Sequence, residues 1–289
     1  MITSPRPARS HLVRLAAATV AVFGLAGCVG GETVVEQLPA AQAVSAPDLV
    51  PFPDDAVGDY QLGGAYEPAP GVTLVVRDST DDPTPGLYNV CYVNGFQTQP
   101  GESEELLAEN PDLILHDASG EPVADPGWPD EYVLDISTDA ARQAVAARAG
   151  EILRTCADRG YDAAEIDNLD SYLRSGGALD IDDATAAARL IVEQGAALGL
   201  VVGQKNTVEL AERGRDDIGF GFAVVEECAV WDECDVLTEV YGGQVLAVEY
   251  TDEGDFTAAC ATPGRPADMI LRDRDLVTPD DDEYVYERC

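Results

Sequence analysis

The feature that most constrains the fold is an alternation of short β-rich runs with helical patterns along the last 230 or so residues. Eight runs predict strands at residues 72–76, 88–93, 132–135, 163–167, 200–204, 220–225, 244–249 and 268–271. Apolar stripes at helical spacing predict helices between most of them, clearest at residues 139–158, 182–198 and 207–213. This alternation predicts an α/β fold, a single (β/α)8 TIM barrel, over an open doubly wound sheet. The run at 132–135 has a rival at 113–115, because residues 117–120 read as a turn between two short strands.

The N-terminus predicts export as a lipoprotein. Three Arg precede a short apolar run, and Cys28 follows the small residues at its end, so residues 1–27 fit a lipoprotein signal. The run is too short for a permanent span, and we expect lipid on Cys28 to hold the chain on the outer face of the cytoplasmic membrane. Residues 28–58 lack a sustained period and predict a flexible tether, which leaves residues 59–289 as one domain.

Acidic residues greatly outnumber basic ones. The chain has 54 Asp and Glu against 17 Lys and Arg, and loss of the three signal Arg would leave 14 basic residues and a net charge of −40. Such a chain would repel a phosphate polymer and offers no basic amphipathic face, which excludes nucleic acid and an anionic lipid surface as partners. A cationic or neutral partner is compatible with this charge, and so is the simpler interpretation that acidity keeps an exported chain soluble.

Six cysteines remain once Cys28 is assigned to lipid, an even number that predicts disulfides in an exported chain. The most favoured pair closes a short loop, and two further pairs are suggested: Cys228–Cys234, then Cys91–Cys156 and Cys260–Cys289. Zinc is the alternative, but no CxxC pair occurs and the only histidines are His11 and His116. We therefore expect no metal site, and without a phosphate-cradling loop we expect no cofactor.

Polar or charged residues end nearly every predicted strand. In a barrel, the loops after the carboxyl ends of the strands build the active site. Strands commonly end where polar residues begin, which explains part of the pattern. It does not explain the carboxylates that lie within otherwise apolar runs on several strands. The residues expected to bind substrate are Asp78, Asn94, Asp135, Glu165, Asn168, Lys205, Asn206, Trp231, Glu249 and Tyr250. For Glu249 the alternative is a salt bridge to Arg272.

The segment around Asp167 is the most informative. Side chains alternate along a strand, so Glu165 and Asp167 share one face, with Asp167 at the rim of the barrel and Glu165 one layer below. Two adjacent carboxylates need a cation to stay ionised. Lys205, the only lysine of the chain, ends the next strand and is the candidate, although a solvated surface lysine is the alternative.

A second carboxylate, Glu226, ends another apolar strand, which suits a general acid. A Cys228–Cys234 loop would place Trp231 at the cleft as a surface for stacking sugars, with ordinary loop packing as the alternative. Two carboxylates on opposite walls of an acidic cleft are the minimal equipment for glycoside hydrolysis. No GxSxG elbow supports a serine hydrolase.

At these residues the chain resembles glycoside hydrolase family 114, the endo-α-1,4-polygalactosaminidases with a TIM barrel. The resemblance spans about residues 59–289 and rests on segments 60–64, 91–93, 133–136, 160–162, 165–172, 203–206, 222–228 and 248–250 and on Cys289. It implies that Asp167 is the nucleophile and Glu226 the acid/base of a retaining hydrolase acting on α-1,4-linked galactosamine polysaccharide, and we expect a monomer. A partly de-N-acetylated polymer of this kind is cationic.

The chain departs from the family beside both carboxylates. Ile166 replaces the family's Pro, and Val225 and Glu227 replace the Asn and Gln that flank its catalytic Glu. A non-catalytic carbohydrate-binding lipoprotein on the same barrel is therefore the alternative function, and a purely structural envelope protein is a third.

Overall fold

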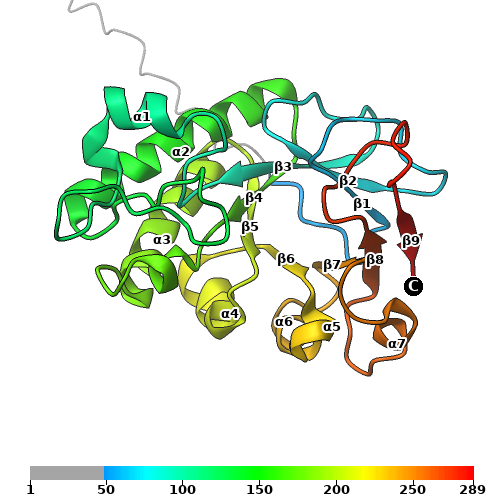
Figure 1. The fold of residues 1–289 in the computed structure, drawn as a ribbon. Coiled ribbons are helices and arrows are strands. Elements are labelled where there is room, and N and C mark those ends of the chain that lie inside the picture. Colours follow the sequence, from blue (N-terminus) through cyan, green and yellow to red (C-terminus); the bar gives the residue numbers. More distant parts are fainter. Residues whose placement is uncertain (1–48) are drawn as a thin grey trace, which may run out of the picture. The chain divides into compact units, whose positions relative to one another are not determined.

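The computed structural model describes residues 49–289, so the predicted signal, Cys28 and most of the predicted tether lie outside the described residues. Nine strands form one curled sheet in chain order (Figure 1). They are β1 (Gly58–Gln61), β2 (Leu74–Asp78), β3 (Tyr88–Asn94), β4 (Ala163–Asp167), β5 (Val201–Lys205), β6 (Phe222–Glu226), β7 (Val245–Tyr250), β8 (Asp268–Arg272) and β9 (Tyr286–Arg288). The first eight run parallel, and β9 pairs antiparallel with β8.

Helices are distributed unevenly along the chain. They are α1 (Ser103–Glu109), α2 (Asp139–Arg159), α3 (Ile181–Ala197), α4 (Ala211–Arg213), α5 (Cys228–Trp231), α6 (Cys234–Tyr241) and α7 (Phe256–Cys260). The two long ones are well capped: the Thr138 hydroxyl accepts from Ala141 N at the start of α2, and Asp180 and Asp183 form a capping box on α3. Figure 1 shows both beside β3–β5, whereas short helices follow β6 and β7.

The predicted α/β fold with parallel strands in sequential order is confirmed, but the regular (β/α)8 barrel is confirmed only in part. Within residues 49–289, no helix joins β1 to β2 or β2 to β3, and no backbone ladder joins β1 to β8 or β9. Side chains bridge this gap instead. Arg272 donates to the carbonyl of Tyr60, and the Tyr286 hydroxyl donates to Gly58 O at 2.9 Å.

The predicted strand at 132–135 is wrong as a member of the sheet. Residues 97–134 form a separate lobe of isolated antiparallel bridges, in which Ile114 pairs with Leu134 and Ala124 with Tyr132. The bridges of the lobe pair its residues with one another, so the lobe adds no strand to the sheet. Strand β3 therefore pairs directly with β4. The apolar pattern of the sequence does not predict β1, because Asp59 and Gln61 are polar, yet both are fully buried.

Packing begins before residue 59. Phe52, in the segment assigned to the tether, is buried and stacks on Phe222 with ring centroids 4.6 Å apart. It belongs to a core cluster inside the curl of the sheet, together with Leu74, Val90 and Leu246. The amino end of the sheet interior is therefore closed by apolar side chains.

All three favoured disulfides are confirmed: Cys91–Cys156, Cys228–Cys234 and Cys260–Cys289. The first ties β3 to α2, and the last ties the C-terminus to α7.

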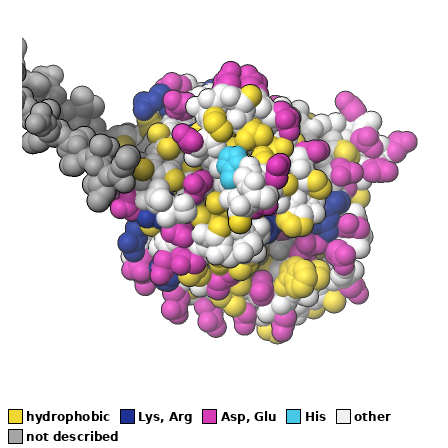
Figure 2. Space-filling view, turned by 60° about the vertical axis from the view of Figure 1, so that its left-hand side comes forward, with side chains coloured by type: hydrophobic (Ala, Val, Ile, Leu, Met, Phe, Trp, Pro, Cys, Tyr) yellow, Lys and Arg dark blue, Asp and Glu magenta, His cyan; other side chains and the backbone are white. Residues whose placement is uncertain are grey.

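Acidic side chains are spread over the face drawn in Figure 2, where basic ones are few. Among the described residues, no helix is long and apolar enough to cross a membrane.

Candidate active site

A cleft of about 880 Å³ lies at the carboxyl ends of the strands. Strands β2 to β7 each contribute a lining residue or end beside one, as expected for parallel strands whose ends meet at one edge. Eight carboxylates line the cleft against three basic side chains, Arg174, Lys205 and Arg274. The cleft thus suits a neutral or cationic ligand better than an anionic one.

Lys205 is the centre of the site. Its Nζ lies 3.1 Å from Glu165 Oε1, 3.2 Å from Asp167 Oδ2 and 3.2 Å from Glu226 Oε2, and it donates to the Tyr60 hydroxyl at 2.9 Å. The side chain is almost fully buried. Burial lowers its pKa, but the carboxylates outweigh that effect and hold the pKa well above the ordinary value. Lys205 is therefore a permanent cation shared by three acids.

Asp167 is held in its ionised form. Burial alone would raise its pKa, but Lys205, the Tyr92 hydroxyl and the Asn168 backbone N–H together lower it below the ordinary value. The Tyr92 hydroxyl donates to Oδ2 at 2.7 Å, and Asn168 N donates to Oδ1 at 2.6 Å. Asn168 can turn its amide back because it adopts a positive φ of 60°, which Asn tolerates better than most residues.

Glu165 lies one layer below Asp167 on the same face of β4, as strand alternation predicts. The Tyr60 hydroxyl donates to its Oε1 at 2.9 Å, while its Oε2 is buried with no hydrogen-bond partner among residues 49–289. Burial raises the pKa of Glu165 to about 7, although Lys205 opposes this. Of the two neighbouring acids, Asp167 carries the charge and Glu165 the more readily retained proton.

Glu226 faces Asp167 across Lys205. The Tyr250 hydroxyl donates to Glu226 Oε1. Asn206 contacts both the backbone and the side chain of Glu226: Asn206 Oδ1 accepts from Glu226 N at 2.8 Å, and Asn206 Nδ2 lies 3.4 Å from Glu226 Oε2. Asn206 directly follows β5 and adopts a positive φ of 47°. Its side chain therefore spans from one strand to the next and fixes the backbone beneath Glu226.

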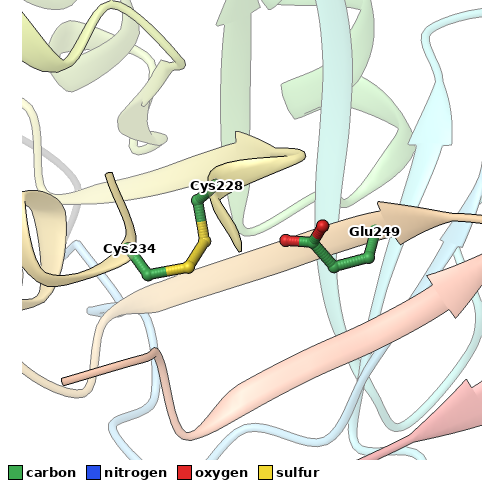
Figure 3. A group of neighbouring side chains, drawn as sticks. All are labelled: Cys228, Cys234 and Glu249. Atoms are coloured by element: carbon green, nitrogen blue, oxygen red, sulfur yellow. A yellow bond between two sulfur atoms is a disulfide. The ribbon is translucent and has the colours of Figure 1, made fainter. Parts of the chain in front are cut away.

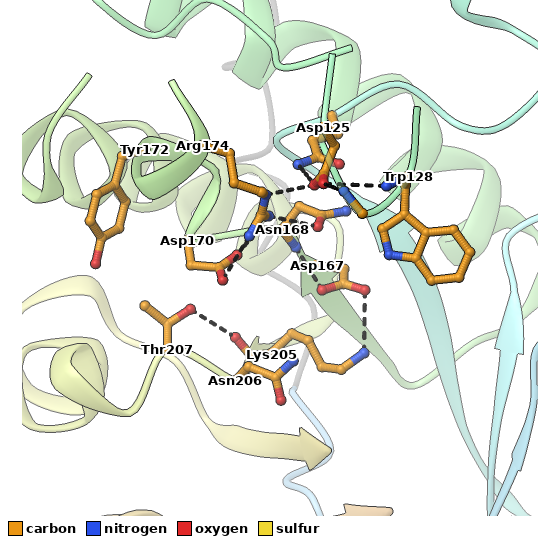
Figure 4. A network of polar contacts seen from close by, with 12 residues as sticks. Asp125, Trp128, Asp167, Asn168, Asp170, Tyr172, Arg174, Lys205, Asn206 and Thr207 are labelled. Atoms are coloured by element: carbon orange, nitrogen blue, oxygen red, sulfur yellow. Dashed lines mark hydrogen bonds and ion pairs between the residues drawn. The ribbon is translucent and has the colours of Figure 1, made fainter. Parts of the chain in front are cut away.

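A polar network covers the Asp167 side of the cleft (Figure 4). Arg174 lies 2.6 Å from Asp125 Oδ2 and 2.8 Å from Asp170 Oδ1, and it donates to Asn168 Oδ1 at 3.1 Å. Asn168 in turn donates to Asn94 Oδ1 at 2.9 Å. The lobe that carries Asp125 is thereby fastened to the strand end that carries Asp167.

Most predicted site residues come together here. The cleft residues and their direct partners include Asp78, Asn94, Glu165, Asp167, Asn168, Lys205, Asn206, Glu226 and Tyr250. Asp78 lies at the rim, where its Oδ1 accepts from Thr80 N at 2.9 Å.

Three predicted residues neither line the cleft nor form side-chain hydrogen bonds with residues that do. Asp135 accepts from Ser137 N at the start of the connection to α2. Trp231 is 67% exposed on the loop closed by Cys228–Cys234, and the exposed indole that lines the cleft is instead that of Trp128. Trp231 is the last residue of the short helix α5.

Glu249 also lies outside the cleft, because strand alternation gives the cleft face to Tyr250 and the opposite face to Glu249. Its Oε1 accepts from Ala229 N at 3.0 Å. The alternative, a salt bridge from Glu249 to Arg272, is wrong too, since Arg272 pairs with Asp59 and Asp273.

Among the described residues, one group places possible metal ligands within 4.8 Å of one another: Cys228, Cys234 and Glu249. The two sulfur atoms are bonded to each other and offer no thiolate (Figure 3).

The sequence analysis missed several residues that complete the site: Tyr60, Tyr92, Trp128, Glu131 and Arg174. Tyr92 precedes the polar end of β3 by two positions, so strand alternation could have assigned it to the same face as Asn94. Trp128 and Glu131 belong to the lobe, whose position over the cleft follows from tertiary packing that no local pattern predicts.

Comparisons with known proteins agree with this fold. A family model described as glycoside-hydrolase family GH114 matches residues 39–289. The chain is similar to the crystal structure of Aspergillus fumigatus Ega3 in complex with galactosamine, with 19% identity over 86% of this chain and 100% of that chain and a TM-score of 0.65. It is also similar to the glycoside hydrolase domain of PelA from Pseudomonas aeruginosa, with 16% identity over 79% and 97% of the two chains and a TM-score of 0.51. No curated protein sequence matches.

Proposed function

Because the chain belongs to glycoside-hydrolase family GH114, we propose that it hydrolyses an amino-sugar polysaccharide, with Asp167 and Glu226 as the reacting carboxylates. The observation that carries this proposal is the position of Lys205, whose Nζ lies 3.2 Å from an oxygen of each. One fixed cation thus holds two carboxylates at the ends of β4 and β6, on either side of β5. A pair of carboxyl groups that flank the scissile bond is what glycoside hydrolysis uses.

Retention of configuration at the anomeric carbon, which the resemblance to the family implies, is compatible with the geometry. Since both oxygens lie within 3.2 Å of the same nitrogen, they are separated by about 6.4 Å at most, twice 3.2 Å. Retaining enzymes place their carboxyl groups about 5–5.5 Å apart, and inverting enzymes need about 6.5–9.5 Å to admit a water molecule.

In the proposed steps the environment of Asp167 assigns it the role of nucleophile, and the resemblance to the family assigns Glu226 the role of acid/base. Asp167, held ionised by Lys205, Tyr92 and the Asn168 N–H, attacks the anomeric carbon while Glu226 gives its proton to the departing glycosidic oxygen. The bond between the sugar and the leaving oxygen breaks as the bond to Asp167 forms. Glu226, now ionised beside Lys205, then takes a proton from water, and that water releases the sugar from Asp167.

The acidity of the cleft supports an α-1,4-linked galactosamine polymer that carries free amines as the substrate. Eight lining carboxylates against three basic side chains favour a cationic chain. The similar Ega3 structure holds galactosamine.

The test is reducing-end release by the full chain from a de-N-acetylated α-1,4-galactosamine polymer and from its N-acetylated form. We expect release, with the amine polymer preferred, and the α-anomer as the first product in proton NMR. The β-anomer as first product would rule out retention. Binding of either polymer without release would establish the non-catalytic carbohydrate-binding alternative.

We also propose that lipid on Cys28 anchors the chain at the outer face of the cytoplasmic membrane. The basic n-region, the short apolar run and the small residues before Cys28 support this. Labelled fatty acid should enter the wild-type protein and not a Cys28→Ser variant, and equal labelling of both would contradict the proposal.

A further inference from the structure

The three basic side chains of the cleft are all paired with carboxylates. Each pairing involves more than one acid: Lys205 with Glu165, Asp167 and Glu226; Arg174 with Asp125 and Asp170; Arg274 with Glu227 and Asp252. Any other acid in the cleft must therefore find its counter-charge elsewhere.

Glu131 is a lining carboxylate that has no such partner. It is only 7% exposed, and within residues 49–289 no lysine, arginine or histidine forms an ion pair with it. Its one side-chain hydrogen bond comes from Asn94 Nδ2, which donates to Oε2 at 3.0 Å. Burial raises the pKa of Glu131 to about 7, Asp167 and Asp125 add to the effect, and Asn94 and Arg174 oppose it.

The other cleft acids without a cation partner are in a different situation. Asp275 is exposed, so water solvates it. Asp78 is partly exposed, and its Oδ1 accepts from the backbone and hydroxyl of Thr80. A buried carboxylate that keeps one oxygen for the cleft gains far more from a charged donor than a solvated one does.

Glu131 is also placed close to the reacting carboxylate. A tight turn of the lobe holds it, since Glu131 N donates to Trp128 O at 2.9 Å and Asp125 N donates to Glu131 O at 2.9 Å. Asn94, its partner, accepts from Asn168 Nδ2 at 2.9 Å, and Asn168 N donates to Asp167 Oδ1. Three hydrogen-bond steps therefore fix Glu131 relative to Asp167.

We infer that Glu131 binds the ammonium group of an amino sugar in the cleft and so selects free-amine sugars over N-acetylated ones. This inference rests on the proposed function. An ammonium supplies the missing counter-charge and up to three donors, whereas an acetamido group brings one weaker donor and a methyl group. Discrimination arises because the N-acetylated sugar would leave a buried carboxylate without its partner.

The test is calorimetric binding at pH 7 of two α-1,4-galactosamine oligosaccharides, one free-amine and one N-acetylated. All proteins carry Glu226→Gln so that neither ligand is cleaved. Against this background, Glu131→Gln should weaken binding of the amine ligand about tenfold and change the N-acetylated ligand by less than twofold. The side chain introduced by Glu131→Gln can still accept the hydrogen bond from Asn94 Nδ2. Thermal unfolding should therefore confirm that the variant is as stable as its parent.

Asp170→Asn is the matched control, because it removes one negative charge from the same cleft at an acid that is already paired with Arg174. It should weaken the amine ligand less than threefold. An equal loss in Asp170→Asn, an equal loss for both ligands in Glu131→Gln, or no loss at all would overturn the role of Glu131 alone. A parent protein that binds neither ligand would overturn the proposed substrate class together with it.

Discussion

The two ends of the sheet interior differ sharply in chemistry although the same strands build both. Along one face of β6 the interior runs from the buried Phe222 to Glu226, and along β4 from Ala163 to Asp167. The amino end is closed by Phe52 stacked on Phe222, while the carboxyl end carries Lys205 and its acids. Within five residues, each of these strands passes from the apolar core to the charged cleft.

The contrast teaches that the charged end depends on the apolar end for its position. Gly203 shows the coupling, because a Cβ there would run into the ring of Phe222. The ring therefore fills the space under β5, and two residues later the same strand presents Lys205 to the cleft. The apolar end should set stability, and the charged end should set activity and its pH dependence.

The largest effect is expected at the charged end. Lys205→Met removes the cation shared by Asp167 and Glu226, so the rate of reducing-end release should fall on the order of 1,000-fold. Circular dichroism should confirm that the variant is folded. A folded variant that keeps more than a tenth of the activity would break the comparison, because the acids would then work without their cation.

The sequence predicted the charged end better than the apolar end. Period-two alternation assigned Glu165 and Asp167 to one face, and the position of the sole lysine at the end of a strand placed it beside them. The resemblance to a known family independently selected Asp167 and Glu226.

The apolar closure could not be predicted in the same way. Phe52 stands in a Pro-rich segment without periodicity, and its burial depends on Phe222, which is 170 residues away in the chain. The lobe around Trp128 escaped for a similar reason, since it pairs with itself and is fastened by long-range contacts of Asn94 and Arg174.

At the apolar end, Phe222→Ala should lower the free energy of unfolding by about 3 kcal/mol, because it leaves a cavity against Phe52 and Gly203. The kcat of reducing-end release should stay within about twofold of wild type at temperatures where the variant is folded. Chemical denaturation with kinetics on the same samples measures both. A parallel loss of kcat would mean that the two ends are not separable.

Between the ends, Glu165 should make stability depend on pH. Its pKa in the folded protein is raised from an ordinary 4.5 to about 7, so its protonated form stabilises the fold below about pH 4.5 and this stabilisation is lost as pH rises through 7. Between pH 5 and pH 8, the free energy of unfolding of the Glu165→Gln variant should fall by about 2 kcal/mol less than that of wild type. Chemical denaturation across this range would contradict the assignment if the two curves run parallel.

The smallest expected effect compares the two exposed tryptophans. Trp128→Ala should raise the KM for polysaccharide about fivefold, because its indole lines the cleft and offers a stacking surface. Trp231→Ala, the matched control on the Cys228–Cys234 loop, should change KM by less than twofold. The reverse ranking would restore the role that the sequence assigned to Trp231.

The most direct test of the central claim is reducing-end release from the free-amine galactosamine polymer by wild type, Asp167→Asn and Glu226→Gln. Because the two carboxylates share Lys205, we expect release by wild type and a loss of at least 1,000-fold in each variant, with polymer binding retained. A folded variant of either kind that still releases reducing ends at more than a tenth of the wild-type rate would contradict it.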